Sequence, residues 1–132
     1  AADRLLDTRA ARMQPSMIVT LHSFTPVYFG ARRNVEIGIL HDADSRLADV
    51  MLNAAKELPH RVVERNSPYG PADGVTHSLI RHGLGRGLPN VMIELRNDLI
   101  RDAAGVAALS DEVLRLLSPA LQSVMTSEAQ HV

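Results

Sequence analysis

The chain has 132 residues, about one domain, and a formal net charge of -1, with 14 basic residues (Lys and Arg) against 15 acidic ones. This near-neutral balance argues against a broad electrostatic contact with nucleic acid. There is no cysteine, which excludes disulfides and thiolate metal sites, so any metal ion would need histidines and carboxylates. The apolar runs are too short to span a membrane and no signal peptide is visible, so we expect a cytoplasmic protein.

Hydrophobic periodicity and turn residues divide the chain into strands and helices. The aliphatic run Met17–Leu21 predicts a strand, whereas apolar residues spaced three and four apart from Leu47 to Leu58 predict an amphipathic helix that ends at Pro59. The segment 23–34 contains Pro26 and Gly30 and is typical of a loop. The expected elements are a helix at 3–13, strands at 17–21 and 35–40, a helix at 47–58, a strand at 61–64, a helix at 76–84, a strand at 91–95 and a helix at 104–125.

This order of elements predicts an α/β fold with a mainly parallel sheet flanked by helices. No internal repeat, low-complexity tract or long linker divides the chain, so we expect residues 1–132 to form a single α/β unit. Four short strands make only a small sheet of this kind.

His22 is the first candidate functional residue because it directly follows the predicted strand 17–21. Ligands of open α/β sheets lie outside the carboxyl ends of the strands, where a histidine can reach a ligand or a metal ion. Taken alone, one such histidine is weak support for a site. No His-Glu-x-x-His motif is present, and His77 and His82 are about 140° apart on a helix, so they cannot bind one ion from the same face.

Glu94 is more informative because it lies inside the apolar run Val91–Leu95, where an unpaired charge is costly to bury. Alternation along the strand places Glu94 and Met92 on the same face of the sheet. The functional interpretation is a general base whose pKa is tuned by partial burial and a nearby cation. The structural interpretation is a salt bridge with an arginine, for which the candidates are Arg32, Arg33 and Arg96. The pattern alone leaves both open.

Five stretches carry a family resemblance when they are taken together. They are Thr20-Leu21-His22-Ser23-Phe24-Thr25-Pro26, Gly30-Ala31-Arg32-Arg33, Glu36-Ile37-Gly38-Ile39-Leu40, Asn66-Ser67-Pro68-Tyr69 and Ile93-Glu94-Leu95-Arg96-Asn97-Asp98-Leu99-Ile100. In this order, and over nearly the whole chain, they resemble the C-terminal half of the N-formylglutamate amidohydrolase family. That family is similar in fold to the zinc carboxypeptidases. The resemblance therefore implies part of a three-layer fold and the C-terminal part of a larger amidohydrolase domain.

The resemblance also implies an activity, namely zinc-dependent hydrolysis of the amide bond of an N-formyl or N-acyl acidic amino acid. It makes His22 a zinc ligand and Glu94 the general base or acid. Arginines would pair with carboxylates of this small acidic substrate through their bidentate geometry. The residues implied to line the substrate site are Arg32, Arg33, Asn66, Tyr69 and Arg96.

One zinc ligand is fewer than such a site requires. A catalytic zinc normally takes three protein ligands and one open position. We therefore expect the remaining ligands on an N-terminal segment of the same protein, without which sheet edges and apolar faces would be uncovered. Two alternatives stay open: a non-catalytic binding or assembly module that retains the fold, and a carboxypeptidase-like or deacylase-like metallohydrolase.

Overall fold

The computed structural model describes residues 2–12, 16–70, 73–74 and 87–130. Its central feature is a four-stranded sheet whose strands lie in the order β1 (Ile18–Phe24), β6 (Asn90–Arg96), β4 (Ile37–Leu40) and β5 (Val63–Arg65). β1 is parallel to β6 and β4 is parallel to β5, whereas β4 runs antiparallel to β6. The prediction of an α/β fold with a mainly parallel sheet flanked by helices is confirmed.

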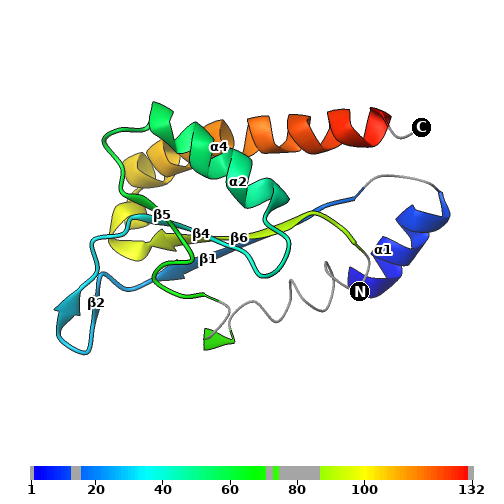
Figure 1. The fold of residues 1–132 in the computed structure, drawn as a ribbon. Helices are drawn as coiled ribbons and strands as arrows, with labels where there is room; N and C mark the ends of the chain where they lie inside the picture. The colour runs from blue at the N-terminus through cyan, green and yellow to red at the C-terminus, as the bar shows by residue number, and fades with distance from the viewer. Residues whose placement is uncertain (1, 13–15, 71–72, 75–86, 131–132) are drawn as a thin grey trace.

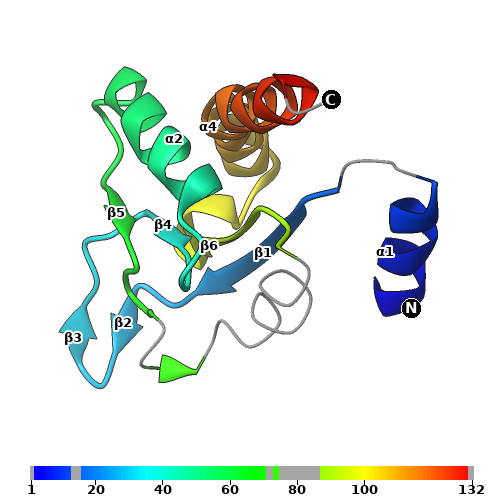
Figure 2. The ribbon, with the colours of Figure 1, turned by 45° about the vertical axis from the view of Figure 1, so that its right-hand side comes forward.

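Two helices form a layer on one face of this sheet (Figure 1). They are α2 (Arg46–Ala54), which continues into a 3-10 turn at Ala55–Glu57, and the long α4 (Ala103–Gln130). A third helix, α1 (Ala2–Ala11), lies apart from this layer and buries none of its residues (Figure 2). No helix among the described residues is long and apolar enough to cross a membrane. The helix expected at 76–84 lies outside the described residues.

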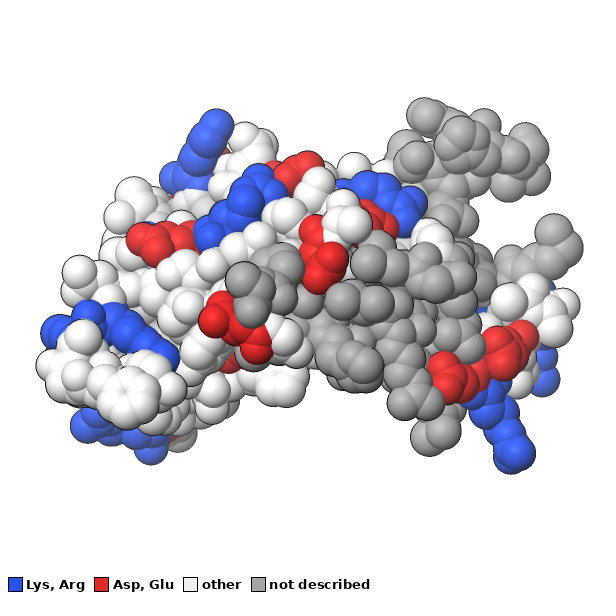
Figure 3. All heavy atoms as spheres, turned by 60° about the horizontal axis from the view of Figure 1, so that its bottom comes forward, with Lys and Arg blue, Asp and Glu red and all other residues white. Residues whose placement is uncertain are grey.

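The two faces of the sheet differ in the side chains that they present. Ile39 and Ile93 belong to the main core, which also includes residues of α2 and α4. Met92 belongs to a second, smaller cluster with Leu40, against which Tyr69 packs. Since side chains alternate along a strand, Glu94 shares the face of Met92, opposite the α2–α4 layer, as predicted. Figure 3 looks from this side, where the acidic and basic side chains of the described residues are interspersed rather than gathered by sign.

Two expectations for residues 17–34 are wrong. β1 continues through His22 to Phe24, because its backbone pairs with β6 as far as Arg96. The segment expected to be a loop contains a short hairpin of β2 (Val27–Tyr28) and β3 (Ala31–Arg32), which turns at residues 29 and 30. Both turn residues have positive φ angles, of 50° and 77°, and the second is a glycine, which adopts such angles readily.

Candidate functional site

The candidate site is built on a row of residues that crosses the sheet. Glu94 on β6 is in register with His22 on β1 and with Gly38 on β4. Residues opposite one another in a ladder point to the same face, so the imidazole of His22 and the carboxyl group of Glu94 are neighbours. His22 is exposed and Glu94 is 5% exposed. The pairing therefore places an accessible imidazole beside a buried acid.

Gly38 completes the row without a side chain, and the loop after β5 takes the space that this leaves. A Cβ atom at Gly38 would collide with the carbonyl oxygen of Ser67. Asn66 fastens the same loop to the end of β4: its N–H donates to Ile39 O at 2.9 Å and its Oδ1 accepts from the N–H of His41 at 2.9 Å. The side-chain oxygen of Asn66 is thus engaged in holding the loop against the row.

We expect Gly38→Ala to lower the free energy of unfolding by about 3 kcal/mol or more, because a backbone carbonyl cannot move aside as a flexible side chain can. The control is Gly30→Ala, where the space is open and only the positive φ is unfavourable, at a cost of about 1–2 kcal/mol. Urea denaturation of the two variants measures both values. A loss at Gly38 no larger than that at Gly30 would contradict the close contact with Ser67.

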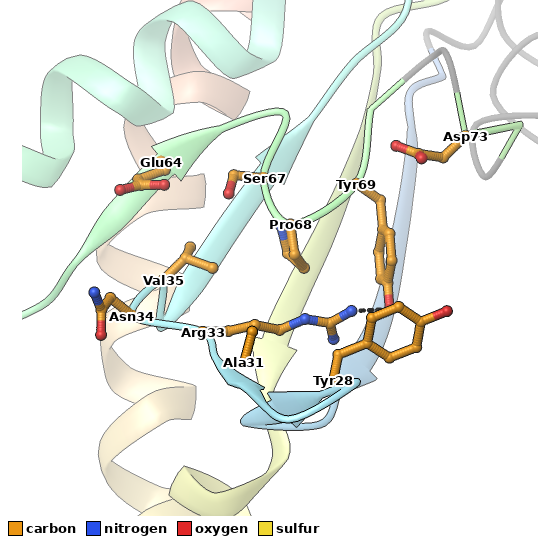
Figure 4. A pocket seen from close by; sticks show the side chains of 10 residues that line it. All are labelled: Tyr28, Ala31, Arg33, Asn34, Val35, Glu64, Ser67, Pro68, Tyr69 and Asp73. Atoms are coloured by element: carbon orange, nitrogen blue, oxygen red, sulfur yellow. Dashed lines mark hydrogen bonds between the residues drawn. The ribbon is translucent and has the colours of Figure 1, made fainter.

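Arg33 lies beside this row, and aromatic rings surround its guanidinium group. The guanidinium carbon lies 4.5 Å from the ring centre of Tyr28, 5.0 Å from that of Tyr69 and 5.6 Å from that of Phe24. Arg33 also donates to the hydroxyl oxygen of Tyr69 at 2.9 Å (Figure 4) and to the carbonyl oxygen of Thr25 at 3.2 Å. Cation–π contacts of this kind fix the position of an arginine without neutralising its charge.

Arg33 and Tyr69 line a cleft of about 560 Å³, together with Ser67 and Pro68 of the loop over Gly38 (Figure 4). Of the predicted substrate residues, the structure therefore brings Arg33 and Tyr69 together. Arg32 is exposed on β3, in the hairpin beside them.

Arg96 is buried, and its hydrogen bonds go to the protein itself. Its Nε donates to Asp98 Oδ1 at 2.7 Å, which holds the pKa of the Asp98 carboxyl group below its ordinary value. Another nitrogen, Nη1, donates to the carbonyl oxygens of Arg33 at 3.0 Å and Asn34 at 3.4 Å. Arg96 thereby holds the backbone that carries Arg33, and its direct contact with substrate stays a prediction.

The carboxyl group of Glu94 has one oxygen that lacks a hydrogen-bond partner among the described residues. Its Oε2 atom is buried and has no hydrogen-bond partner among the described residues, which also provide no salt bridge to Glu94. Burial raises the pKa of Glu94 above its ordinary value, whereas the charges of His22 and Arg33 oppose this shift. The structural salt bridge considered for this glutamate is therefore not found in the described part of the chain.

The aromatic surroundings of Arg33 were missed in the sequence, although a signal was present. The chain has only two phenylalanines and two tyrosines, and three of these four lie between residues 24 and 29. Such a concentration in a chain otherwise poor in aromatics marks a local cluster. Three of the four rings contact Arg33, as given above.

The fold and site define an α/β protein with a histidine–glutamate pair and an arginine-lined cleft on the face of the sheet opposite the α2–α4 layer. The family model of N-formylglutamate amidohydrolase matches residues 1–101, and the chain belongs to this family, as its sequence motifs indicated. It is also similar to the crystal structure of gene product Atu2144 from Agrobacterium tumefaciens, with a TM-score of 0.89 and 52% identity over 94% of this chain. The chain spans 49% of that Agrobacterium chain. No curated protein matched the sequence.

Proposed function

We propose that the protein hydrolyses the amide bond of an N-formyl or N-acyl acidic amino acid with the help of zinc. The observation that carries the proposal is the buried, unpartnered Oε2 of Glu94, in register with His22 and near the charge of Arg33. A buried carboxylate without a partner is costly, so such a group is more often found where it has a reaction to perform. Membership of the N-formylglutamate amidohydrolase family supports the choice of reaction.

His22 would be one ligand of the zinc ion, because its exposed imidazole shares a face of the sheet with Glu94. The described residues contain no group of three histidines or carboxylates that could hold a metal, so the other ligands would lie outside them. Bound zinc supplies Lewis acidity, which polarises an amide carbonyl and lowers the pKa of a water molecule.

Glu94 would act as the proton carrier. Its free Oε2 would accept a proton from the water that attacks the amide carbon and would deliver it to the amide nitrogen as the C–N bond breaks. The products are an amine and a carboxylic acid, which is formic acid for an N-formyl substrate. Burial favours this role because it brings the pKa of the carboxyl group closer to neutrality.

Arg33 would bind a carboxylate of the substrate, because its guanidinium is held at the cleft by aromatic rings and has no acidic partner among the described residues. We expect Arg33→Lys to raise the KM for N-formylglutamate by about 10-fold to 100-fold with a smaller change in kcat, because a buried charged hydrogen bond contributes about 1.5–3 kcal/mol. Steady-state kinetics of the complete protein measures both constants. The same measurement on Arg32→Lys tests the second candidate arginine.

The control for this change is Arg115→Lys on α4, where the arginine is exposed and pairs with Asp111 of the same helix. A KM unchanged in Arg33→Lys would remove Arg33 from substrate binding. A substrate panel then separates the related activities, since turnover of neutral peptides in preference to N-formylglutamate would favour a carboxypeptidase-like or deacylase-like hydrolase.

A further inference from the structure

Arg96 and Asp98 form a largely buried ion pair at the end of β6, the strand that also carries Glu94. Asp98 lies in the 3-10 turn Asn97–Ile100, which directly follows the strand. Nε of Arg96 donates to Asp98 Oδ1 at 2.7 Å and Nη2 donates to Asp98 Oδ2 at 3.3 Å, so both carboxylate oxygens are engaged. The two side chains are only 9% and 17% exposed. Two contacts with one carboxylate fix the orientation of the planar guanidinium.

The remaining nitrogen of Arg96, Nη1, binds the backbone of the segment that carries Arg33. It donates to Arg33 O at 3.0 Å and to Asn34 O at 3.4 Å. The N–H of Arg33 donates in turn to Pro26 O at 2.7 Å, at the base of the β2–β3 hairpin. Both polar backbone groups of Arg33 are therefore bound, one to the hairpin and the other to Arg96. These hydrogen bonds fix the point of the backbone from which the side chain of Arg33 starts.

The guanidinium of Arg33 needs such support, because the contacts around it are tolerant of movement. Its charge is attracted by three aromatic rings, and attraction to a ring acts at any position within about 6 Å of the ring centre. A long side chain that moves loses freedom when it binds a ligand, and this loss weakens binding. A backbone that is already fixed lowers this cost, so the support of Arg33 bears on substrate affinity.

We propose that Asp98 and Arg96 are positioning residues, which hold Arg33 in the direction in which it binds the acidic group of the substrate. Arg96 acts through Arg33 and does not touch the substrate, because each of its three side-chain nitrogens donates to a protein acceptor. This inference rests on the proposed function and gives Arg96 a different role from the substrate contact that the family resemblance implies. It also joins the two halves of the site, since β6 carries both Glu94 and Arg96.

The test is steady-state kinetics of the complete protein with Asp98→Asn, which removes the charge and nearly keeps the shape of the side chain. We expect the KM for N-formylglutamate to rise about 3-fold to 10-fold with a smaller change in kcat, because an unsupported arginine loses more freedom on binding. In a background of Arg33→Ala, the same substitution should lower kcat/KM by less than about 2-fold, since the side chain that it positions is absent. Asp111→Asn is the matched control, because Asp111 pairs with the exposed Arg115 on α4, and its KM should equal that of the parent.

A second variant and a second measurement separate positioning from stability. Asp98→Asn leaves the charge of Arg96 unpaired, whereas Arg96→Lys keeps a positive charge opposite Asp98. A single ammonium group cannot replace both ends of a planar guanidinium, so Arg96→Lys should lose the contact with Arg33 O and raise KM to a similar extent. In both variants we expect amide hydrogen exchange at Arg33 to be about 10-fold faster than in the parent.

An unchanged KM in both variants would overturn the proposal, as would unchanged hydrogen exchange at Arg33. A loss of kcat/KM in Asp98→Asn that persists in full in the Arg33→Ala background would also overturn it, because the ion pair would then act independently of Arg33. Hydrogen exchange is measured without substrate, so it tests the support of Arg33 separately from hydrolysis. A parent protein that releases no formate, with faster exchange at Arg33 in both variants, would refute the proposed function alone.

Discussion

Glu94→Gln should lower kcat for hydrolysis of N-formylglutamate by about 10²-fold to 10⁴-fold, the usual contribution of a positioned general base. Glutamine has nearly the same shape, and Oε2 of Glu94 has no hydrogen-bond partner among the described residues, so the substitution breaks no described contact of that atom. The loss would therefore report the proton transfer itself. The measurement is steady-state kinetics of the complete protein with zinc present, in which KM should change little.

The stability of this variant provides an internal check. Burial raises the pKa of Glu94 in the folded protein. At a pH between the ordinary pKa and this raised pKa, the folded protein therefore keeps a proton that the unfolded chain has released. The free energy of unfolding contributed by this group is therefore highest below its ordinary pKa and falls as the pH rises through the raised pKa. A glutamine side chain does not ionise, so the free energy of unfolding of Glu94→Gln does not fall in this way as the pH rises. The variant should therefore be at least as stable as the parent at neutral pH in urea denaturation.

Glu57→Gln is the matched control, since Glu57 is exposed on the 3-10 turn after α2, and its activity should equal that of the parent. Turnover of the Glu94 variant within a few-fold of the parent would exclude Glu94 from the mechanism. An inactive variant that is also much less stable would instead assign the residue a structural role.

His22→Ala should lower the affinity for zinc by more than about 100-fold, because a direct ligand of the ion is lost. Loss of a residue that only hydrogen-bonds to a metal ligand already lowers metal affinity by about 10-fold to 100-fold. The fold should be unaffected, since His22 is exposed and its backbone pairing with β6 does not involve the imidazole. Zinc content after dialysis against a weak chelator measures the effect. His60→Ala is the control, because His60 Nε2 hydrogen-bonds to Glu112 Oε1 at 2.8 Å. An unchanged zinc content in His22→Ala would contradict the assignment.

Much of the fold follows from local patterns. The spacing of apolar residues located α2, and the apolar run that only Glu94 interrupts located β6, whose seven residues are all buried. The true length of β1 could not be predicted in this way. Its last residues, from His22 to Phe24, have no strong strand pattern of their own and are extended because β6 offers a continuous ladder of backbone partners.

The sequence likewise predicts one part of the candidate site and not the other. Glu94 could be singled out because a carboxylate within an apolar strand needs an explanation, and its neighbour His22 follows from the parallel register. The partners of Arg96 and Asn66 could not be predicted, because Asp98, the carbonyl group of Arg33 and the N–H of His41 are placed by tertiary contacts. The family resemblance indicated Arg96 and Asn66 as substrate residues. It did not indicate that their hydrogen bonds hold the backbone around the cleft in position.

The central claim is that Glu94 and His22 serve one zinc-dependent hydrolysis. The most direct measurement is the rate of formate release from N-formylglutamate by the complete protein, before and after removal of metal with a chelator. The account predicts that turnover disappears with the metal and returns when zinc is added back. Full turnover in the metal-free protein, or zinc-loaded protein that releases no formate from this substrate, would contradict it.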